Sequence, residues 1–191
     1  MSTIEESGEG EETLNAEQLK NFIYEVPDFP KPGIGFKDIA PLVRDAAAYG
    51  YVVDRLLEWA RPKRPEVVIG IESRGYLFAG PVARDLGLGL DVIRKKGKLP
   101  RKTVSVRAPN EYAVEVFEMH EDTIRPGQRV VIIDDLIATG SSSIAAIDLV
   151  RLLKGEPMGF GAVIELGFLG GTANIRKAHP EVEVFSIVRY D

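Results

Sequence analysis

Two adjacent aspartates, Asp134 and Asp135, stand between an apolar run and a small polar loop. Residues 130–133 are all valine or isoleucine, which is typical of a strand buried on both faces of a parallel sheet. Residues 139–143 read Thr-Gly-Ser-Ser-Ser and are small enough for backbone N–H groups to approach an anion closely. The helical spacing of residues 144–154, with Gly155 as the expected C-cap, puts this loop at a helix N-terminus.

This combination suits a sugar phosphate. The loop and the helix N-terminus would hold the phosphate, and the two carboxylates would hold ribose hydroxyls, directly or through a metal ion and its waters. The plainer alternative is an ordinary strand-to-helix turn with a capping serine and two solvent-facing aspartates. We favour the binding site, because no structural need accounts for two carboxylates at the end of a buried strand.

A second strand-loop-helix unit carries a cation instead of acids. Residues 67–71 form another buried apolar run, the loop 72–75 (Glu-Ser-Arg-Gly) follows it, and helical spacing continues to about Leu86. Arg74 and the loop amides could bind a second phosphate group. The alternative is a surface arginine at a helix start, where the helix macrodipole disfavours a cation. Beside the first site, we favour anion binding.

A strongly basic segment follows a short strand expected at residues 90–93. Six of the nine residues from Arg94 to Lys102 are basic. Such a run is usually a solvated surface. Because charge clusters little elsewhere in the chain and the inferred ligand is highly anionic, we interpret this segment as a cationic rim over a pyrophosphate.

A proline-rich segment near the N-terminus is open to two interpretations. Residues 27–39 hold three prolines and two glycines, which argue against regular structure, and they include Phe29 and Phe36. A rigid loop with aromatic side chains could stack on a planar ligand and offer backbone polar groups to its edge. Alternatively, the phenylalanines fill the core beneath the loop, and composition alone favours this second interpretation.

The alternation of strand and helix patterns predicts an α/β fold with a mostly parallel twisted sheet flanked by helices. Asn15 and Gln18 form a capping box that opens an amphipathic helix ended by Pro27, and Asp45 caps a second helix. Further strands are expected at 103–107, 113–119, 161–166 and 182–188, with a short helix ending near Ala178.

The strands at 103–107 and 113–119 are expected to form an arm beside the main sheet, with Glu111 near its tip. From its position alone, Glu111 is better explained as a solvent-exposed turn acid. His120 and His179 lie far apart without a carboxylate pattern around them. We therefore expect both histidines at the surface.

Charge and composition exclude several classes of protein. Residues 1–19 hold six glutamates and no lysine or arginine, and removing them leaves 23 acidic against 24 basic residues. Residues 1–14 are expected to be a disordered acidic tail, and the nearly neutral remainder gives no support for binding nucleic acid or an anionic membrane. The absence of cysteine excludes disulfides and thiolate metal sites and fits a cytoplasmic protein. Neither a signal peptide nor an apolar run long enough to span a membrane is found in the sequence.

Residues 130–143 resemble the phosphoribosyl pyrophosphate (PRPP) binding motif of type I phosphoribosyltransferases. Ser141 and Ser142 stand where that family usually has Gly and Thr. Glycine tolerates a positive φ and serine does so poorly, so the backbone at Ser141 is the point where the motif departs from the pattern. From Asp28 onwards the chain is similar to the adenine phosphoribosyltransferases. The blocks that carry this similarity are Asp-Phe-Pro-Lys-Pro-Gly (28–33), Phe-Lys-Asp-Ile (36–39), Glu-Ser-Arg-Gly-Tyr-Leu-Phe (72–78), Arg-Lys-Lys-Gly-Lys-Leu-Pro (94–100) and Glu-Tyr (111–112).

The resemblance implies the type I phosphoribosyltransferase fold, with residues 15–191 as a single domain, a small N-terminal hood at about 15–45 and a β-arm lid at about 103–119. It also implies roles for individual residues, which fall into five groups. Glu111 and Arg74 would be catalytic, and Tyr112 would belong to the lid. The ribose and 5′-phosphate would be bound by Asp134, Asp135, Ala138, Thr139, Gly140, Ser141 and Ser142. The pyrophosphate would be bound by Glu72, Ser73, Arg74, Gly75, Lys95 and Lys98. Adenine would be bound by Gly35, Phe36, Lys37 and Leu166.

The implied reaction is the formation of AMP and pyrophosphate from adenine and PRPP. Mg²⁺ would be held mainly by PRPP and would have no direct protein ligand. A water molecule would connect it to Asp134. The resemblance further implies a homodimer, and the nearly neutral charge of the chain beyond its acidic tail leads us to expect neither a nucleic-acid nor a membrane partner. Three alternatives stay open: a phosphoribosyltransferase for hypoxanthine, xanthine or orotate; a PRPP-sensing regulatory protein; and a metal-dependent phosphohydrolase that uses the aspartate pair.

Overall fold

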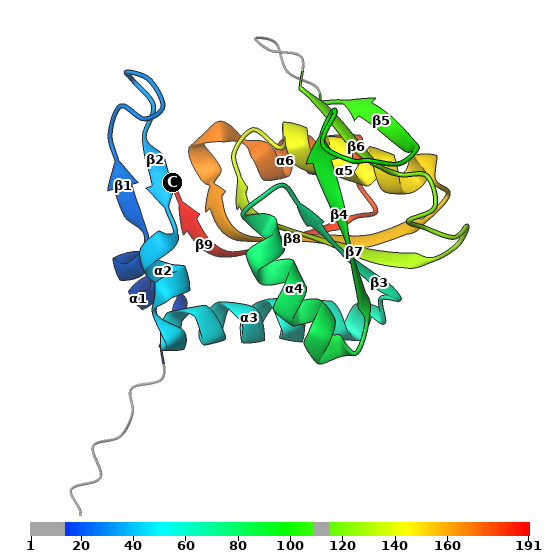
Figure 1. Ribbon diagram of the computed structural model, residues 1–191. Helices are drawn as coiled ribbons and strands as arrows, with labels where there is room; N and C mark the ends of the chain where they lie inside the picture. The colour runs from blue at the N-terminus through cyan, green and yellow to red at the C-terminus, as the bar shows by residue number, and fades with distance from the viewer. Residues whose placement is uncertain (1–13, 109–114) are drawn as a thin grey trace, which may run out of the picture. The chain divides into compact units, whose positions relative to one another are not determined.

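Figure 1 shows the computed structural model, which describes residues 14–108 and 115–191. The expected acidic tail, apart from Leu14, and the lid residues Glu111 and Tyr112 lie outside the described residues. The chain divides into two compact units, Met1–Tyr49 and Gly50–Asp191. No helix among the described residues is both long and apolar enough to cross a membrane.

The N-terminal unit begins with the predicted capping box. The Asn15 side chain accepts hydrogen bonds from the Glu17 and Gln18 N–H groups, and the Gln18 side chain accepts one from the Asn15 N–H, which opens α1 (Ala16–Leu19). The helix is shorter than predicted. A 3₁₀ turn, η1 (Lys20–Phe22), follows it, and β1 (Tyr24–Val26) pairs antiparallel with β2 (Phe36–Asp38).

Two predictions for this unit are therefore wrong. The helix does not continue to Pro27, because residues 24–26 hydrogen-bond across to β2, and this pairing overrides their helical spacing. The proline-rich segment is not wholly irregular, because after its last glycine, Gly35, the chain is free to extend as β2. Beyond β2 lie α2 (Ala40–Arg44) and α3 (Ala46–Ala60), and the Asp45 carboxylate caps α3 by accepting the Ala48 N–H at 2.9 Å.

A seven-stranded sheet with the order β5-β6-β4-β3-β7-β8-β9 forms the centre of the second unit. The parallel part consists of β4 (Gly89–Lys95), β3 (Val67–Ile71), β7 (Arg129–Ile137), β8 (Glu156–Leu166) and β9 (Glu183–Tyr190). The strands β3 and β7 contain the two buried apolar runs found in the sequence. The α/β fold with a mostly parallel sheet is confirmed.

Helices cover both faces of this sheet. Gly70 of β3 meets Tyr76 and Ala79 of α4 (Gly75–Leu86), which packs on one face. The opposite face, with Ile69 and Ile132, packs in one apolar core with residues of α5 (Ser141–Leu152) and with Ile175 of α6 (Gly171–Ala178). Strands that are buried on both faces are apolar on both faces, which explains their lack of alternation.

The end of α5 differs from the prediction. Lys154, with φ of 63°, takes the left-handed position expected for Gly155. Gly155 follows it and donates its N–H to the Val150 carbonyl at 2.9 Å. A Cβ at Gly155 would lie 2.7 Å from the Ile124 side chain, so glycine is needed there for close packing.

The predicted antiparallel arm is present as β5 (Thr103–Arg107) and β6 (Val116–His120), and it joins the main sheet because β6 also pairs with β4. Phe117 and Met119 of β6 are buried in the core. The surface prediction for the two histidines is wrong. His120 is buried where β6 pairs with β5, and His179 is buried at the end of α6, with its Nε2 3.3 Å from the Asp148 carboxylate on α5.

Candidate active site

The two aspartates lie where β7 extends beyond its pairing with β3. β7 pairs with β3 up to Ile133 and with β8 up to Ile137, so Asp134 and Asp135 lie past the end of that first pairing. Both side chains are buried. The carboxyl ends of parallel strands are the usual place for ligands in open α/β sheets. The structure thus puts the acidic pair at this edge, within the strand and not in the loop after it.

Burial controls the electrostatics of the pair. Burial, reinforced by the charge of Asp135, raises the pKa of the Asp134 carboxyl well above its usual range. Burial also raises the pKa of Asp135, although the nearby Arg74 guanidinium acts in the opposite direction. Arg74 lies with one guanidinium nitrogen 2.8 Å from the Asp135 carboxylate. Arg74 thus contacts one of the two carboxyls directly, and the carboxyl oxygens can accept hydrogen bonds from hydroxyl groups.

The loop 72–75 connects β3 to α4 and is drawn tightly against β7. A Cβ on Gly75 would lie 2.8 Å from the Ile133 carbonyl and 3.0 Å from Cα of Asp134. Only glycine permits so close an approach of the α4 N-terminus to the acidic pair. The peptide bond between Glu72 and Ser73 is cis. Through this loop the structure brings Arg74, predicted for the pyrophosphate, to Asp135, predicted for the ribose.

Residues 138–142 connect β7 to α5 and include the first two residues of that helix. We call them the anion loop. Gly140 has φ of 83°, and α5 begins at the next residue, Ser141. Because Gly140 takes the left-handed conformation, Ser141 needs no positive φ, and the replacement of the family's usual glycine costs no backbone strain here. The Thr139 and Ser141 hydroxyls lie 3.0 Å apart. The first N–H groups of a helix have no partner within the helix, so this loop offers the anion-binding geometry that the sequence predicts.

Two residues of α6 that were not predicted from the sequence contact the backbone of this loop. Asn174 on α6 donates its side-chain N–H to the Thr139 carbonyl at 3.0 Å. Gly171, at the start of α6, is so close that a Cβ there would lie 2.2 Å from the Ala138 carbonyl oxygen. The sequence carried a signal for the second residue, since a Gly-Gly pair preceded the predicted helix. It carried none for Asn174.

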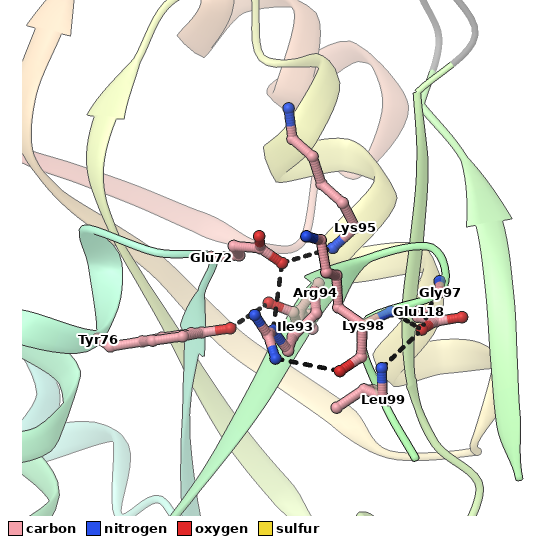
Figure 2. A network of polar contacts seen from close by, with 9 residues as sticks. All are labelled: Glu72, Tyr76, Ile93, Arg94, Lys95, Gly97, Lys98, Leu99 and Glu118. Carbon is pink, nitrogen blue, oxygen red and sulfur yellow. Dashed lines mark hydrogen bonds and ion pairs between the residues drawn. The ribbon is translucent and has the colours of Figure 1, made fainter. Parts of the chain in front are cut away.

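The basic segment, residues 94–102, begins with the last two residues of β4 and continues as a loop beside the loop 72–75, as Figure 2 shows. We call residues 94–102 the basic loop. The Glu72 carboxylate accepts hydrogen bonds from the Lys95 N–H at 2.9 Å and from the Arg94 side chain at 3.3 Å. Glu72, predicted to face the pyrophosphate, is thus engaged in holding the chain of the basic loop. The side chain of Lys95 is exposed and forms an ion pair with Glu115 at 2.6 Å, and Lys98 is also exposed.

The residues predicted for the base lie in both units. Phe36 contacts Phe29 edge to face, with ring centroids 5.1 Å apart, and the Lys37 ammonium lies 2.8 Å from the Glu25 carboxylate. Gly35 approaches the same carboxylate so closely that a Cβ would lie 2.8 Å from its oxygen. Leu166 is buried at the end of β8. Since Leu166 belongs to the second unit, its meeting with residues 35–37 over a base stays a prediction.

No group of three or more potential metal ligands occurs among residues 14–108 and 115–191. Within the second unit the site thus combines an anion loop, an acidic pair and an arginine at the ends of β7 and β3. This arrangement can bind a phosphorylated sugar that carries a second anionic group.

Comparison with known proteins agrees with this chemistry. Residues 43–190 match the phosphoribosyl transferase domain family. The adenine phosphoribosyltransferase of Rhodothermus marinus is 40% identical, with a TM-score of 0.87 over 92% of this chain and 98% of that one. The enzyme of Thermoanaerobacter pseudethanolicus is 39% identical, with a TM-score of 0.86 over 92% of this chain and 100% of that one.

The Saccharomyces cerevisiae adenine phosphoribosyltransferase, solved with an imino-altritol bisphosphate and adenine, is 36% identical, with a TM-score of 0.80 over 90% of this chain and 97% of that one. The range matched by the family model, residues 43–190, includes the sheet, the anion loop and the acidic pair described above. The chain therefore belongs to the adenine phosphoribosyltransferase family.

Proposed function

We propose that this protein transfers the phosphoribosyl group of PRPP to adenine, which yields AMP and pyrophosphate in purine salvage. The observation that carries the proposal is the meeting of Arg74 with the acidic pair at the end of β7, next to the loop 138–142. PRPP is a ribose with a 5′-phosphate at one end and a pyrophosphate at the other. The loop suits the phosphate, Asp134 and Asp135 suit the ribose hydroxyls, and Arg74 suits the pyrophosphate.

The reaction breaks the bond between the anomeric carbon of the ribose and the pyrophosphate oxygen, and forms a bond from that carbon to N9 of adenine. Both electrons of the broken bond leave with the pyrophosphate, N9 attacks with its free lone pair, and the base gives up its imidazole proton from N7, where Glu111 would accept it. Negative charge grows on the departing oxygen, and positive charge grows on the ribose ring. Arg74, together with Lys95 and Lys98, would stabilise the first, and the buried Asp134 and Asp135 would stabilise the second.

Mg²⁺ is part of the proposal as a companion of the substrate. The ion usually keeps several waters and binds through one or two carboxylates together with substrate phosphates, and the acidic pair offers two such carboxylates. Bound with PRPP, Mg²⁺ would neutralise charge on the leaving pyrophosphate. Asp134 would contact it through water, while Asp135 stays paired with Arg74.

Adenine would lie between Phe36 and Leu166, with the backbone groups of Gly35 and Lys37 at its edge. Glu111 would exchange a proton at N7, and Tyr112 would close over the site as part of a lid. The solved relatives support a base site for adenine: the yeast enzyme was crystallised with adenine, and the 30% identical Giardia lamblia enzyme with 9-deazaadenine. We further propose that the protein is cytoplasmic and forms a homodimer. Light scattering on the purified chain would test the dimer.

A screen of free bases tests the proposed function. Purified protein with PRPP and Mg²⁺ is offered adenine, hypoxanthine, xanthine or orotate in turn, and nucleotide and pyrophosphate are both measured. We expect AMP from adenine and far slower turnover of the other bases. A preference for another base would reassign the substrate. Phosphate release from PRPP without any base would identify a phosphohydrolase, and PRPP binding without turnover of any base would favour a regulatory protein.

A further inference from the structure

The basic loop after β4 is held from two sides by carboxylates (Figure 2). On one side, Glu72 accepts from the Lys95 N–H and from the Arg94 side chain. On the other side stands Glu118 of β6, which faces the Lys96–Leu99 turn. The Arg94 guanidinium also donates to the Lys98 carbonyl at 3.1 Å, which ties the two halves of the loop together.

Glu118 has an unusual set of partners. A single oxygen, Oε1, accepts the N–H groups of three consecutive residues, Gly97, Lys98 and Leu99, at 3.0, 3.2 and 3.2 Å. Its other oxygen accepts the Thr103 hydroxyl at 3.4 Å, and the residue is only 5% exposed. Successive N–H groups that converge on one point form the concavity with which a backbone normally binds an anion. Here the protein fills that concavity with its own carboxylate.

The charge of the loop explains why a carboxylate is used. Arg94, Lys95, Lys96 and Lys98 put four cations in five residues. Their mutual repulsion would spread the loop in the absence of a ligand, and the neighbouring carboxylates of Glu72, Glu115 and Glu118 offset that repulsion. Charge-assisted hydrogen bonds to N–H groups are about twice as strong as neutral ones. Glu118 therefore fixes the backbone while the side chains of Lys95 and Lys98 stay exposed, and Figure 2 shows Lys95 extending away from the hydrogen-bonded backbone.

We propose that Glu118 is the positioning residue for the pyrophosphate group of PRPP: by capturing the backbone of residues 97–99, it presets the exposed lysines of this loop to receive a diphosphate. This inference rests on the proposed function, because it concerns the same site. Glu118 itself touches no substrate. Its contribution comes from ordering the loop before PRPP arrives, so that less ordering is required on binding.

The test compares Glu118→Gln and Glu118→Ala with the wild-type protein. The first variant keeps the shape and removes the charge, and the second removes the acceptor as well. We expect the Kd for PRPP with Mg²⁺, measured by calorimetry without adenine, and the KM for PRPP to rise about tenfold or more in Glu118→Ala and by less in Glu118→Gln. The KM for adenine should stay unchanged. Amide hydrogen exchange at residues 97–99 should accelerate in both variants.

Glu121→Gln is the matched control, because Glu121 follows on from the same strand, is exposed and should leave PRPP affinity at the wild-type value. Wild-type PRPP affinity in folded Glu118→Gln overturns the proposal, and this variant decides the matter if Glu118→Ala does not fold. Equal losses in the KM values for PRPP and adenine also overturn it. If the wild type binds PRPP in a Glu118-dependent way but makes no AMP, the proposed function fails and this inference stands. If the wild type does not bind PRPP, both fail.

Discussion

Gly171 offers the sharpest test of the anion loop, because it touches the loop from outside the binding surface. The residue opens α6 and packs against the chain at Ala138. A Cβ placed there would lie 2.2 Å from the Ala138 carbonyl oxygen and 2.7 Å from the Ile137 side chain. The substitution Gly171→Ala therefore forces the loop 138–142 and α6 apart without removing any group that would bind phosphate.

The size of the effect follows from these distances. Ordinary contacts between heavy atoms begin well above 3 Å, so the loop must move by about 1 Å to admit the new methyl group. Overpacking of this kind costs about 1–3 kcal/mol of folding stability. A shift of about 1 Å in a group that positions substrate can lower the rate on the order of 10²-fold. We expect this loss of rate to appear mainly as a lower kcat/KM for PRPP.

The assay measures AMP formation at varied PRPP together with thermal unfolding. Gly155→Ala is the control, because its Cβ would lie 2.7 Å from the Ile124 side chain and should likewise cost stability. Gly155 immediately precedes β8, at the opposite end of that strand from Leu166. We expect the control to keep kcat/KM close to the wild-type value. Folded Gly171→Ala with wild-type kinetics for PRPP, or the same kinetic loss in both variants, would refute the reasoning.

Three further variants test other parts of the site. Asp134→Asn should raise the Tm relative to wild type at neutral pH, and by less near pH 4. The reason is that folding raises the pKa of the Asp134 carboxyl, so the wild-type native state loses stability as pH rises. The same variant should weaken PRPP binding in calorimetry. Arg74→Gln leaves the buried Asp135 without its cation and should lower the free energy of unfolding, measured in urea, by about 1–3 kcal/mol. The same variant should also bind pyrophosphate more weakly. Glu111→Gln should reduce kcat by about 10²-fold with little change in the Kd for PRPP, if Glu111 exchanges the proton at N7; an unchanged single-turnover rate would contradict this role.

The sequence predicted those parts of the site that follow directly on a buried strand. Residues 67–71 and 130–133 are apolar runs of β3 and β7, and the groups that follow these runs, Arg74 and the pair Asp134 and Asp135, could be assigned to one sheet edge because ligands bind at the carboxyl ends of parallel strands. The structure confirms that the loops after these strands come together. It adds that α5 starts at Ser141, directly after Gly140, so no positive φ falls on the serine.

Residues that act by reaching across the fold were not predictable. Glu118 lies on β6, where an acid among apolar residues looks like an ordinary solvent-facing position, and only the pairing of β6 with β4 brings it to the loop 97–99. Asn174 is an unremarkable polar residue of a short helix until α6 packs behind Thr139. The burial of His120 and His179 likewise depends on tertiary packing that no local pattern encodes.

A crystal structure with PRPP, Mg²⁺ and an unreactive adenine analogue tests the central claim most directly. We predict the 5′-phosphate on the N–H groups of residues 139–142, the ribose hydroxyls on Asp134 and Asp135, and the pyrophosphate between Arg74 and the basic loop. A pyrophosphate bound away from both Arg74 and that loop, or a 5′-phosphate bound elsewhere than at the start of α5, would contradict the account.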